Sequence, residues 1–282
     1  MDDDANPGSL PPETAVGRVA LRVNDLGRVR EFYESVVGLE TIRADGGTAT
    51  LGAGGTPLLR LIGDPDAPER GRDETGLFHT AVRVPSRAAL ADALERVEEW
   101  GLDGASDHLV SEALYFDDPE GNGVEVYRDR PRSEWPETDA GRVAMETLPL
   151  DLSALRGSGP GAERVPDGTD VGHVHLEVSS TAAARAFYVD ALGLRVRQTY
   201  GDEALFLAAG DYHHHVGANV WNGRTAPATG RGLEWFELDV PAGAVDDCRS
   251  RLEAAGFGTR DASEGFATAD RDGIELRVRP VD

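Results

Sequence analysis

The order of apolar and polar positions repeats along this chain. Residues 16–39 (VGRVALRVNDLGRVREFYESVVGL) align without a gap to residues 171–194 (VGHVHLEVSSTAAARAFYVDALGL). Each stretch begins with the alternation of a half-buried strand and continues with the spacing of an amphipathic helix. The sequence therefore predicts an internal duplication whose second half begins near residue 170.

Each half also contains one copy of a second repeated stretch. Residues 76–102 resemble residues 232–257, again as a strand followed by an amphipathic helix. Each continues to a turn and a strand, DPEGNGVEVY (118–127) and DRDGIELRV (270–278), and NG or DG between β-rich runs favours a tight turn. The repeats predict an α+β fold of four βαβββ modules, which begin near residues 16, 77, 171 and 232.

The composition between the repeats predicts the domain boundaries. Residues 1–15 are acidic and Pro-rich and lack the basic start and apolar run of a signal peptide, so we expect a flexible tail on a cytoplasmic protein. Residues 16–130 hold modules 1 and 2, and residues 171–282 hold modules 3 and 4. Residues 131–170 are rich in Pro, Gly and polar residues and are expected to connect the two halves.

The charge of the chain argues against two classes of partner. Fifty-one acidic residues oppose 28 basic ones, all of them Arg, for a formal net charge of −23. Such a charge disfavours nucleic acid and anionic membrane surfaces as partners. The sequence contains no run of about 18 apolar residues, so we expect no membrane span. The acids are dispersed, which is typical of a solvated surface in a halophilic organism that accumulates salt in its cytoplasm.

The single Cys248 lies in a helical pattern and is expected to be a packed residue.

Four motifs carry a resemblance to a known family: HTAVRVP, DHLVSEALYFDDPEGNGVEVYRDRPRSEW, GHVHLEV and GDYHHHVGANVW. Together they resemble the vicinal oxygen chelate superfamily of glyoxalase I, fosfomycin-resistance proteins and extradiol dioxygenases, and most of all its catechol 2,3-dioxygenase branch. The resemblance implies two cupped mixed β-sheet barrels with flanking helices. It also implies one divalent metal, held by two His and one Glu from the first and last strands of paired modules. That donor set leaves open positions suited to Fe(II), although Mn(II) could replace it.

The corresponding positions of the four modules can be compared for this ligand set. The first strands offer Arg18, His79, His173 and Trp235, and the last strands of modules 2 and 4 offer Glu125 and Glu275. Only the pairing of modules 2 and 3 completes the set, with His79, His173 and Glu125. We therefore expect modules 2 and 3 to form the active barrel, either within one chain or between the chains of a homo-oligomer. In the other barrel, Glu275 is expected to form a salt bridge with Arg18.

The resemblance also implies catalytic residues around the metal. His215 matches a non-ligand acid/base histidine, and Tyr115 matches a tyrosine that donates a hydrogen bond to the substrate. Alternation along a strand would put His213 on the side of His215 and turn His214 away. His175, His108 and His213 are further candidates for supporting or substrate contacts.

The resulting hypothesis is an Fe(II)-dependent extradiol dioxygenase. It would convert a small aromatic diol, catechol or a substituted catechol, and O2 to a product of the 2-hydroxymuconic semialdehyde type. Two alternatives stay open on the same fold. One is a metal-dependent isomerase or lyase of the glyoxalase type, which typically carries a second Glu in place of His215. The other is a non-catalytic protein that binds an aromatic compound or a drug.

Overall fold

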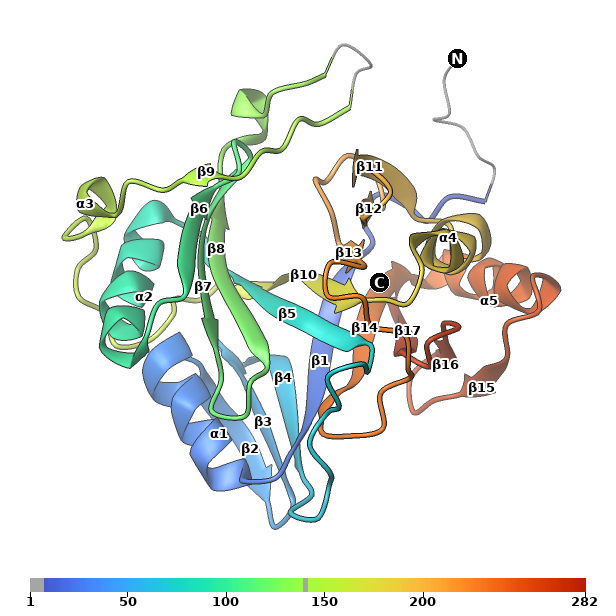
Figure 1. The fold of residues 1–282 in the computed structure, drawn as a ribbon, viewed down its shortest axis with the longest axis horizontal. Helices are drawn as coiled ribbons and strands as arrows, with labels where there is room; N and C mark the ends of the chain where they lie inside the picture. The colour runs from blue at the N-terminus through green and yellow to red at the C-terminus, as the bar shows by residue number, and fades with distance from the viewer. Residues whose placement is uncertain (1–7, 139–141) are drawn as a thin grey trace.

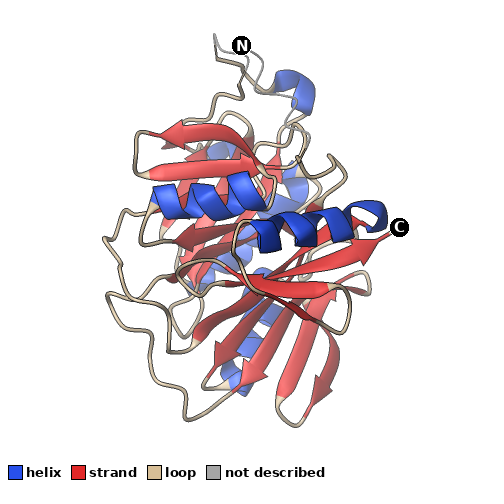
Figure 2. Ribbon diagram, turned by 90° about the vertical axis from the view of Figure 1, so that its right-hand side faces the viewer, coloured by secondary structure: helices blue, strands red, loops and turns tan. Residues whose placement is uncertain are grey.

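Two curled β-sheets form the framework of the chain, as a computed structural model that describes residues 8–138 and 142–282 shows (Figures 1 and 2). In the described residues the first sheet has eight strands, in the order β15 (Thr259–Asp261), β16 (Phe266–Ala269), β17 (Glu275–Val281), β14 (Gly232–Pro241), β1 (Ala15–Val23), β4 (Thr56–Gly63), β3 (Thr48–Ala53) and β2 (Glu40–Asp45). The second has nine, in the order β11 (Arg195–Tyr200), β12 (Ala204–Ala208), β13 (Val216–Asn219), β10 (Asp170–Glu177), β5 (Gly76–Arg83), β8 (Gly123–Asp129), β7 (Ser111–Asp117), β6 (Gly104–Asp107) and β9 (Leu148–Pro149).

Helices flank these sheets on the outside (Figure 1). The α-helices are α1 (Leu26–Phe32), α2 (Arg87–Trp100), α3 (Leu152–Leu155), α4 (Thr181–Ala184) and α5 (Val245–Ala254). Helix α1 continues into a π-helical turn, η1 (Tyr33–Val37), and α4 continues into another, η3 (Arg185–Ala191). Short 3₁₀ turns are η2 (Arg132–Glu134) and η4 (Ala242–Ala244). The longest helix, α2, begins after Ser86, whose hydroxyl accepts the backbone N–H of Ala89, as a helix N-cap does.

Each sheet combines two modules that lie far apart in the sequence. Strand β5 pairs antiparallel with β10, and each pairs in parallel with the last strand of its own module, β8 and β13. In the same way, β1 pairs antiparallel with β14. Strand β1 pairs in parallel with β4, and β14 pairs in parallel with β17. Every module has the order βαβββ, so the predicted α+β fold is confirmed. One sheet contains modules 1 and 4 and the other contains modules 2 and 3, within a single chain.

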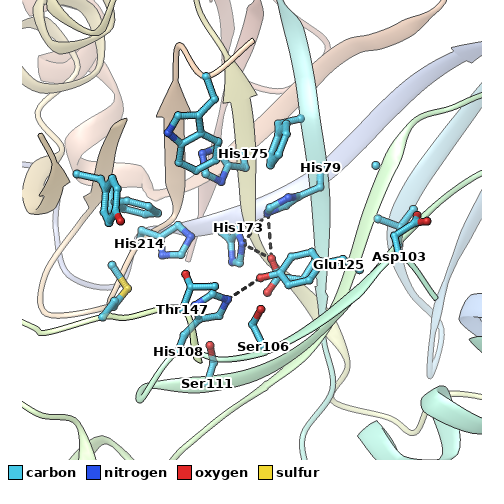
Figure 3. A pocket seen from close by; sticks show the side chains of 18 of the residues that line it. His79, Asp103, Ser106, His108, Ser111, Glu125, Thr147, His173, His175 and His214 are labelled. Atoms are coloured by element: carbon cyan, nitrogen blue, oxygen red, sulfur yellow. Dashed lines mark hydrogen bonds and ion pairs between the residues drawn. The ribbon is translucent and has the colours of Figure 1, made fainter. Parts of the chain in front are cut away.

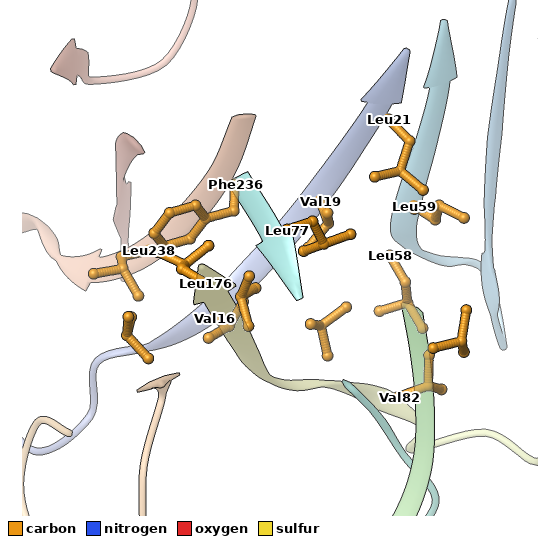
Figure 4. Packing of buried hydrophobic residues seen from close by; sticks show 14 of the residues in the cluster. Val16, Val19, Leu21, Leu58, Leu59, Leu77, Val82, Leu176, Phe236 and Leu238 are labelled. Atoms are coloured by element: carbon orange, nitrogen blue, oxygen red, sulfur yellow. The ribbon is translucent and has the colours of Figure 1, made fainter. Parts of the chain in front are cut away.

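The hydrophobic core lies where the first strands of the modules cross, between the two sheets. Val19 of β1, Leu176 of β10 and Phe236 of β14 are completely buried there (Figure 4). Burying side chains of this size stabilises the fold by about 1.5–3 kcal/mol each. Since successive residues of a strand face opposite sides, the burial of Leu176 in the core leaves His175 on the hollow face of the nine-stranded sheet.

A β-bulge in β5 changes the alternation at one point. His79 stands opposite His175, but Leu77 stands opposite Leu176, so Phe78 is an extra residue on its strand. As a result Phe78 and His79 both face the hollow side, while Leu77 joins the core. Bulges commonly redirect side chains in this way beside functional sites.

The segments outside the modules are only partly described. The expected tail, residues 1–15, includes residues 1–7, which lie outside the described residues. Further along, Leu10 is buried, and its backbone N–H donates to the carbonyl oxygen of Gly193. The connector, residues 131–170, contributes β9, which pairs with β6 at the edge of the second sheet. None of the described helices is long and apolar enough to cross a membrane.

Candidate metal centre and the cavity around it

A cavity of about 420 Å³ opens on the hollow face of the nine-stranded sheet. His79 of β5, Glu125 of β8 and His173 of β10 line it together (Figure 3). The Nε2 atoms of His79 and His173 lie 2.9 and 3.1 Å from Oε2 of Glu125, and 3.3 Å from each other. All three side chains are buried, and in the described part of the chain they are the one group whose nitrogen and carboxylate atoms could hold a metal ion.

The strand register explains why these residues meet. Ala81 of β5 stands opposite Glu125 on one side and His173 on the other. Its small, fully buried side chain leaves room for the longer neighbours to meet above it. His79 lies two residues earlier on the same strand and therefore points to the same face. The strand register therefore places Glu125 and His173 on either side of Ala81, with His79 beside them on the same face.

The protonation states of the group suit a metal. Although burial alone would raise it, contacts with His173 and His79 hold the pKa of Glu125 well below its usual value. Burial lowers the pKa of His173 to about 4, despite the opposing effect of Glu125. An ionised carboxylate beside a neutral imidazole is the state in which both can bind a divalent cation. Two imidazole nitrogens and one carboxylate oxygen on a single face fit a metal with open positions toward the cavity.

Tyr115 and His108 form a hydrogen-bonded pair on the opposite wall of the cavity. The Nδ1–H of His108 donates to the carbonyl oxygen of Glu146 over 2.7 Å, because a carbonyl can only accept. With His108 neutral, its Nε2 is an acceptor, and the hydroxyl of Tyr115 donates to it over 2.7 Å. Burial, and then the nearby charge of Glu125, raises the pKa of Tyr115 well above its usual value. Tyr115 therefore faces the cavity as a neutral hydrogen-bond donor.

The three adjacent histidines are arranged differently from the expectation. His214 lines the cavity, and its ring centroid lies 4.0 Å from that of His173. His215 is not among the described residues that line it. Its Nδ1 accepts the backbone N–H of Ala209, and its ring packs against Tyr212 at 4.9 Å. The prediction that His214 points away is wrong, and the acid/base role expected of His215 stays a prediction.

The physical reason for this correction is the local backbone. Strand β13 begins only at Val216, and residues 209–215 form an irregular turn in which Gly210 has a φ of +59°. Alternation along a strand therefore does not apply to His213, His214 and His215. The glycine at position 210, two residues after the end of β12, was the sequence signal for such a turn.

His213 connects His214 to a carboxylate that the sequence did not single out. Nδ1 of His213 lies 2.7 Å from Nδ1 of His214, and Nε2 of His213 lies 3.0 Å from Oδ1 of Asp129. Although burial opposes it, hydrogen bonds from His213 and Arg83 lower the pKa of Asp129, which is therefore an anion that only accepts. In its neutral form His213 carries its hydrogen on Nε2, and the Nδ1–H of His214 then donates to Nδ1 of His213. This arrangement leaves Nε2 of His214 as a free acceptor.

His175 lines the cavity among aromatic rings. Its ring lies 5.0 Å from that of His79 and 5.3 Å from that of Phe78. Its Nε2 is buried and has no hydrogen-bond partner among the described residues. Nδ1 of His173 is likewise buried without a partner in the described chain. His79, Glu125 and His173 together are called the metal group below. His175 lies beside this group but is not one of the residues that could hold the ion.

The corresponding face of the eight-stranded sheet is filled with ion pairs. Arg18, at the position of His173, donates to Glu237 over 2.6 Å and also contacts Glu264. Glu275 instead pairs with Arg260 and Arg277. The predicted Arg18–Glu275 salt bridge is therefore wrong, because the repeat alignment gives the face of each residue but not its neighbour across strands.

Comparisons with known proteins identify the family to which this chain belongs. Residues 15–126 match the family model described as the Glyoxalase/Bleomycin resistance protein/Dioxygenase superfamily. The chain is 38% identical over 275 residues to catechol-2,3-dioxygenase of Bacillus subtilis (strain 168), which covers 93% of this chain and 95% of that protein. It is also 29% identical over 114 residues to biphenyl-2,3-diol 1,2-dioxygenase 3 of Rhodococcus globerulus, which covers 39% of this chain and 60% of that protein.

A solved structure shares the fold. Glyoxalase I from Zea mays superimposes with a TM-score of 0.60 at 15% identity, over 95% of this chain and 92% of that one. At this level of identity the likeness concerns the fold alone.

Proposed function

The chain belongs to the Glyoxalase/Bleomycin resistance protein/Dioxygenase superfamily as a catechol 2,3-dioxygenase-like oxidoreductase, and from this premise we propose that it is an Fe(II)-dependent extradiol dioxygenase. Its substrate is catechol or a substituted catechol. The ring is cleaved beside the two hydroxyl groups, and both atoms of O2 enter a product of the 2-hydroxymuconic semialdehyde type. For catechol itself the sum of ring and O2 equals the product, so no further reductant is needed.

One observation carries the proposal. The His79, His173 and Glu125 group opens onto a cavity that also presents a hydroxyl donor, Tyr115, and an imidazole, His214. A two-His, one-carboxylate face leaves positions open for more than one ligand, which is the arrangement of non-haem Fe(II) oxygenases. When bound, the metal supplies Lewis acidity that lowers the pKa of a diol hydroxyl and activates O2.

Tyr115 orients the substrate in this proposal. Its pKa is raised by burial, so the hydroxyl stays protonated and can donate to a deprotonated diol oxygen. His108 holds that hydroxyl through a 2.7 Å hydrogen bond before the substrate arrives. The single hydroxyl hydrogen points to His108 in the free site, so it turns to the diol oxygen when the substrate binds, where a donor aimed at developing negative charge stabilises it.

His214 moves the proton. Burial lowers its pKa well below the usual value, so the resting imidazole is neutral. Its Nδ1–H is directed to His213, which leaves Nε2 to accept a proton from a diol hydroxyl. The protonated ring can then return that proton to an oxygen atom later in the cycle. This is the role that the sequence-based hypothesis gave to His215.

The decisive experiment measures O2 consumption. The protein is loaded anaerobically with Fe(II), freed of excess metal and mixed with catechol in air. Uptake of one O2 per catechol together with the yellow ring-fission chromophore is expected. Parallel loading with Mn(II) identifies the metal that supports turnover. Glu125→Gln, which removes the anionic ligand at nearly constant volume, is expected to abolish both signals.

The same experiment separates the alternatives. A metal-dependent isomerase of the glyoxalase type would bind the metal and consume no O2 with any simple catechol. The glyoxalase-type members that the sequence resembles carry a second Glu, whereas the group in the described residues of this chain contains one carboxylate. A non-catalytic binding protein would bind catechol and leave it unchanged.

A further inference from the structure

One end of the cavity is walled by aromatic rings. Phe78 of β5, Phe206 of β12 and Trp221, which follows β13, surround the ring of His175, and we call these four residues the aromatic corner. The His175 centroid lies 5.3 Å from Phe78, 5.7 Å from Phe206 and 5.3 Å from Trp221. Figure 3 shows His175 directly beside His79 of the metal group. A ring held by that group can therefore place a substituent against an apolar wall.

The backbone makes room for this corner. Gly217 of β13 faces the ring of His175, and a Cβ atom at this position would lie 2.8 Å from its Cδ2 and Cγ atoms. Any larger residue at position 217 would push the ring into the cavity. The corner thus depends on a glycine whose lack of a side chain keeps the space open.

The charged groups of the cavity wall are of one sign. Asp103, Asp117 and Glu146 line it in addition to Glu125, and among the described residues that line it there is no arginine. The chain contains no lysine at all. Burial, and then the nearby carboxylate of Asp103, raises the pKa of Asp117, as expected where no cation lies close by. Apart from the metal that the proposed function places at His79, Glu125 and His173, a carboxylate on the substituent would find like charges and no cationic partner among the arginine-free described lining.

The size of the cavity exceeds what one small ring requires. Its volume of about 420 Å³ falls within the range of roughly 300–1,000 Å³ of pockets that take drug-sized ligands. Trp221 and Tyr200 also line it, and both are large side chains that are exposed to solvent at 43% and 64%. An apolar substituent on the substrate would cover part of this exposed apolar surface.

We propose that the substrates of this site are catechols with an uncharged, apolar ring substituent, alkyl or aryl, seated in the aromatic corner, and that catechols with a carboxylate side chain are rejected. This inference rests on the proposed function. It adds the charge and polarity of the substituent, which neither the metal group nor the acid/base residues determine.

The test compares substrates of matched shape on the full-length, Fe(II)-loaded protein. 3,4-Dihydroxyphenylacetate is compared with its methyl ester and with 4-propylcatechol, and 3-substituted compounds are run in parallel. Since like-charge contacts cost several-fold to many-fold in affinity, kcat/KM for the ester and the propyl compound is expected to exceed that for the acid by at least about 100-fold. Calorimetric titration without O2 should give the same order of Kd. An acid that reacts within threefold of its ester would overturn the inference.

A charge reversal in the corner provides the second measurement. Trp221→Arg introduces a cation at an exposed position and is expected to raise kcat/KM for the acid relative to the ester at least tenfold. Trp221→Gln is the matched control, because Gln is polar like Arg but carries no charge, and it should not raise that ratio. An unchanged ratio in Trp221→Arg would show that the substituent lies elsewhere. If no catechol is cleaved by the wild-type protein, the proposed function fails, and the anaerobic Kd values alone then decide the charge preference.

Discussion

His213 and His214 face each other through their Nδ1 atoms at 2.7 Å, and this contact links the cavity to Asp129 on the far end of β8. Only one hydrogen can lie between the two Nδ1 atoms. When His213 is neutral, Asp129 accepts its single hydrogen, on Nε2, so the hydrogen between the two Nδ1 atoms belongs to His214. The carboxylate therefore sets the tautomer of a histidine that it does not touch.

Asp129→Asn tests this connection. An amide can donate to Nε2 of His213, which would reverse both tautomers and place a hydrogen on Nε2 of His214. We expect kcat to fall about 10- to 100-fold with KM within threefold, because the geometry is kept while the acceptor is lost. Two-dimensional ¹⁵N–¹H correlation spectra of the Zn(II)-loaded protein, labelled at histidine, should show the exchange of protonated nitrogens directly.

Asp170→Asn is the matched control for that experiment. Asp170 also binds Arg83, over 2.5 Å, but makes no contact with the histidines that the structure describes. It should leave the histidine signals and kcat unchanged. Equal losses in Asp129→Asn and Asp170→Asn would contradict the tautomer explanation and indicate a structural effect through Arg83.

The histidine that handles the proton can be identified by two parallel substitutions. His214→Gln removes the imidazole that lines the cavity, and we expect kcat to fall about 100-fold or more, within the range of general acid–base catalysis. His215→Gln keeps an acceptor for the N–H of Ala209 and is expected to retain activity within about threefold. Steady-state rates of O2 uptake distinguish the two, and a larger loss in His215→Gln would restore the assignment made from the sequence.

Tyr115→Phe should affect the rate more than binding. Loss of one hydroxyl donor that faces developing charge commonly lowers kcat by about 10²–10³-fold. His108→Ala leaves the donor in place but removes its 2.7 Å partner, so a smaller loss is expected. If the double variant is no worse than Tyr115→Phe alone, His108 acts through Tyr115, and additive losses would show an independent role.

The grouping of His79, Glu125 and His173 could be foreseen because a repeat gives corresponding positions on a sheet. Once four modules were aligned, only modules 2 and 3 offered two histidines and a glutamate, and strand alternation put them on one face. The same reasoning could not find the partner of Arg18, since neighbours across strands depend on register and bulges. Register shifts such as the one at Phe78 leave no clear mark in a single sequence.

The position of His214 could not be predicted for a related reason. It depends on a turn at Gly210 and on Asp129, a residue from another module 85 positions earlier in the chain. Periodicity describes regular elements, whereas residues 209–215 follow the backbone of a loop. Which ring lines the cavity therefore depends in part on Asp129, a charged residue on a distant strand that binds His213.

The metal content should be about one ion per chain. The corresponding positions of the eight-stranded sheet hold Arg18 and Trp235, and Arg277 lies over the Trp235 ring at 4.1 Å. Neither position offers an imidazole, and the carboxylates of Glu237 and Glu275 are already paired with arginines. Inductively coupled plasma mass spectrometry after Fe(II) loading and desalting is expected to give about one equivalent, and less than about a tenth in Glu125→Gln. Two equivalents retained in the wild-type protein would contradict the single site.

Stability should decrease with acid, and His215 should contribute to this loss. Burial, and then the charges of His213 and Arg83, lower the pKa of His215 to about 3, against an ordinary value of 6.5. Between these values the unfolded chain binds a proton that the folded protein does not. The contribution is therefore complete above pH 6.5 and is lost as the pH falls toward 3. At about 1.4 kcal/mol per pH unit, it amounts to about 2 kcal/mol between pH 6.5 and 4.5. Urea unfolding at these two pH values should show a loss that is smaller by about this amount in His215→Gln, and equal losses in both proteins would refute the role of this histidine.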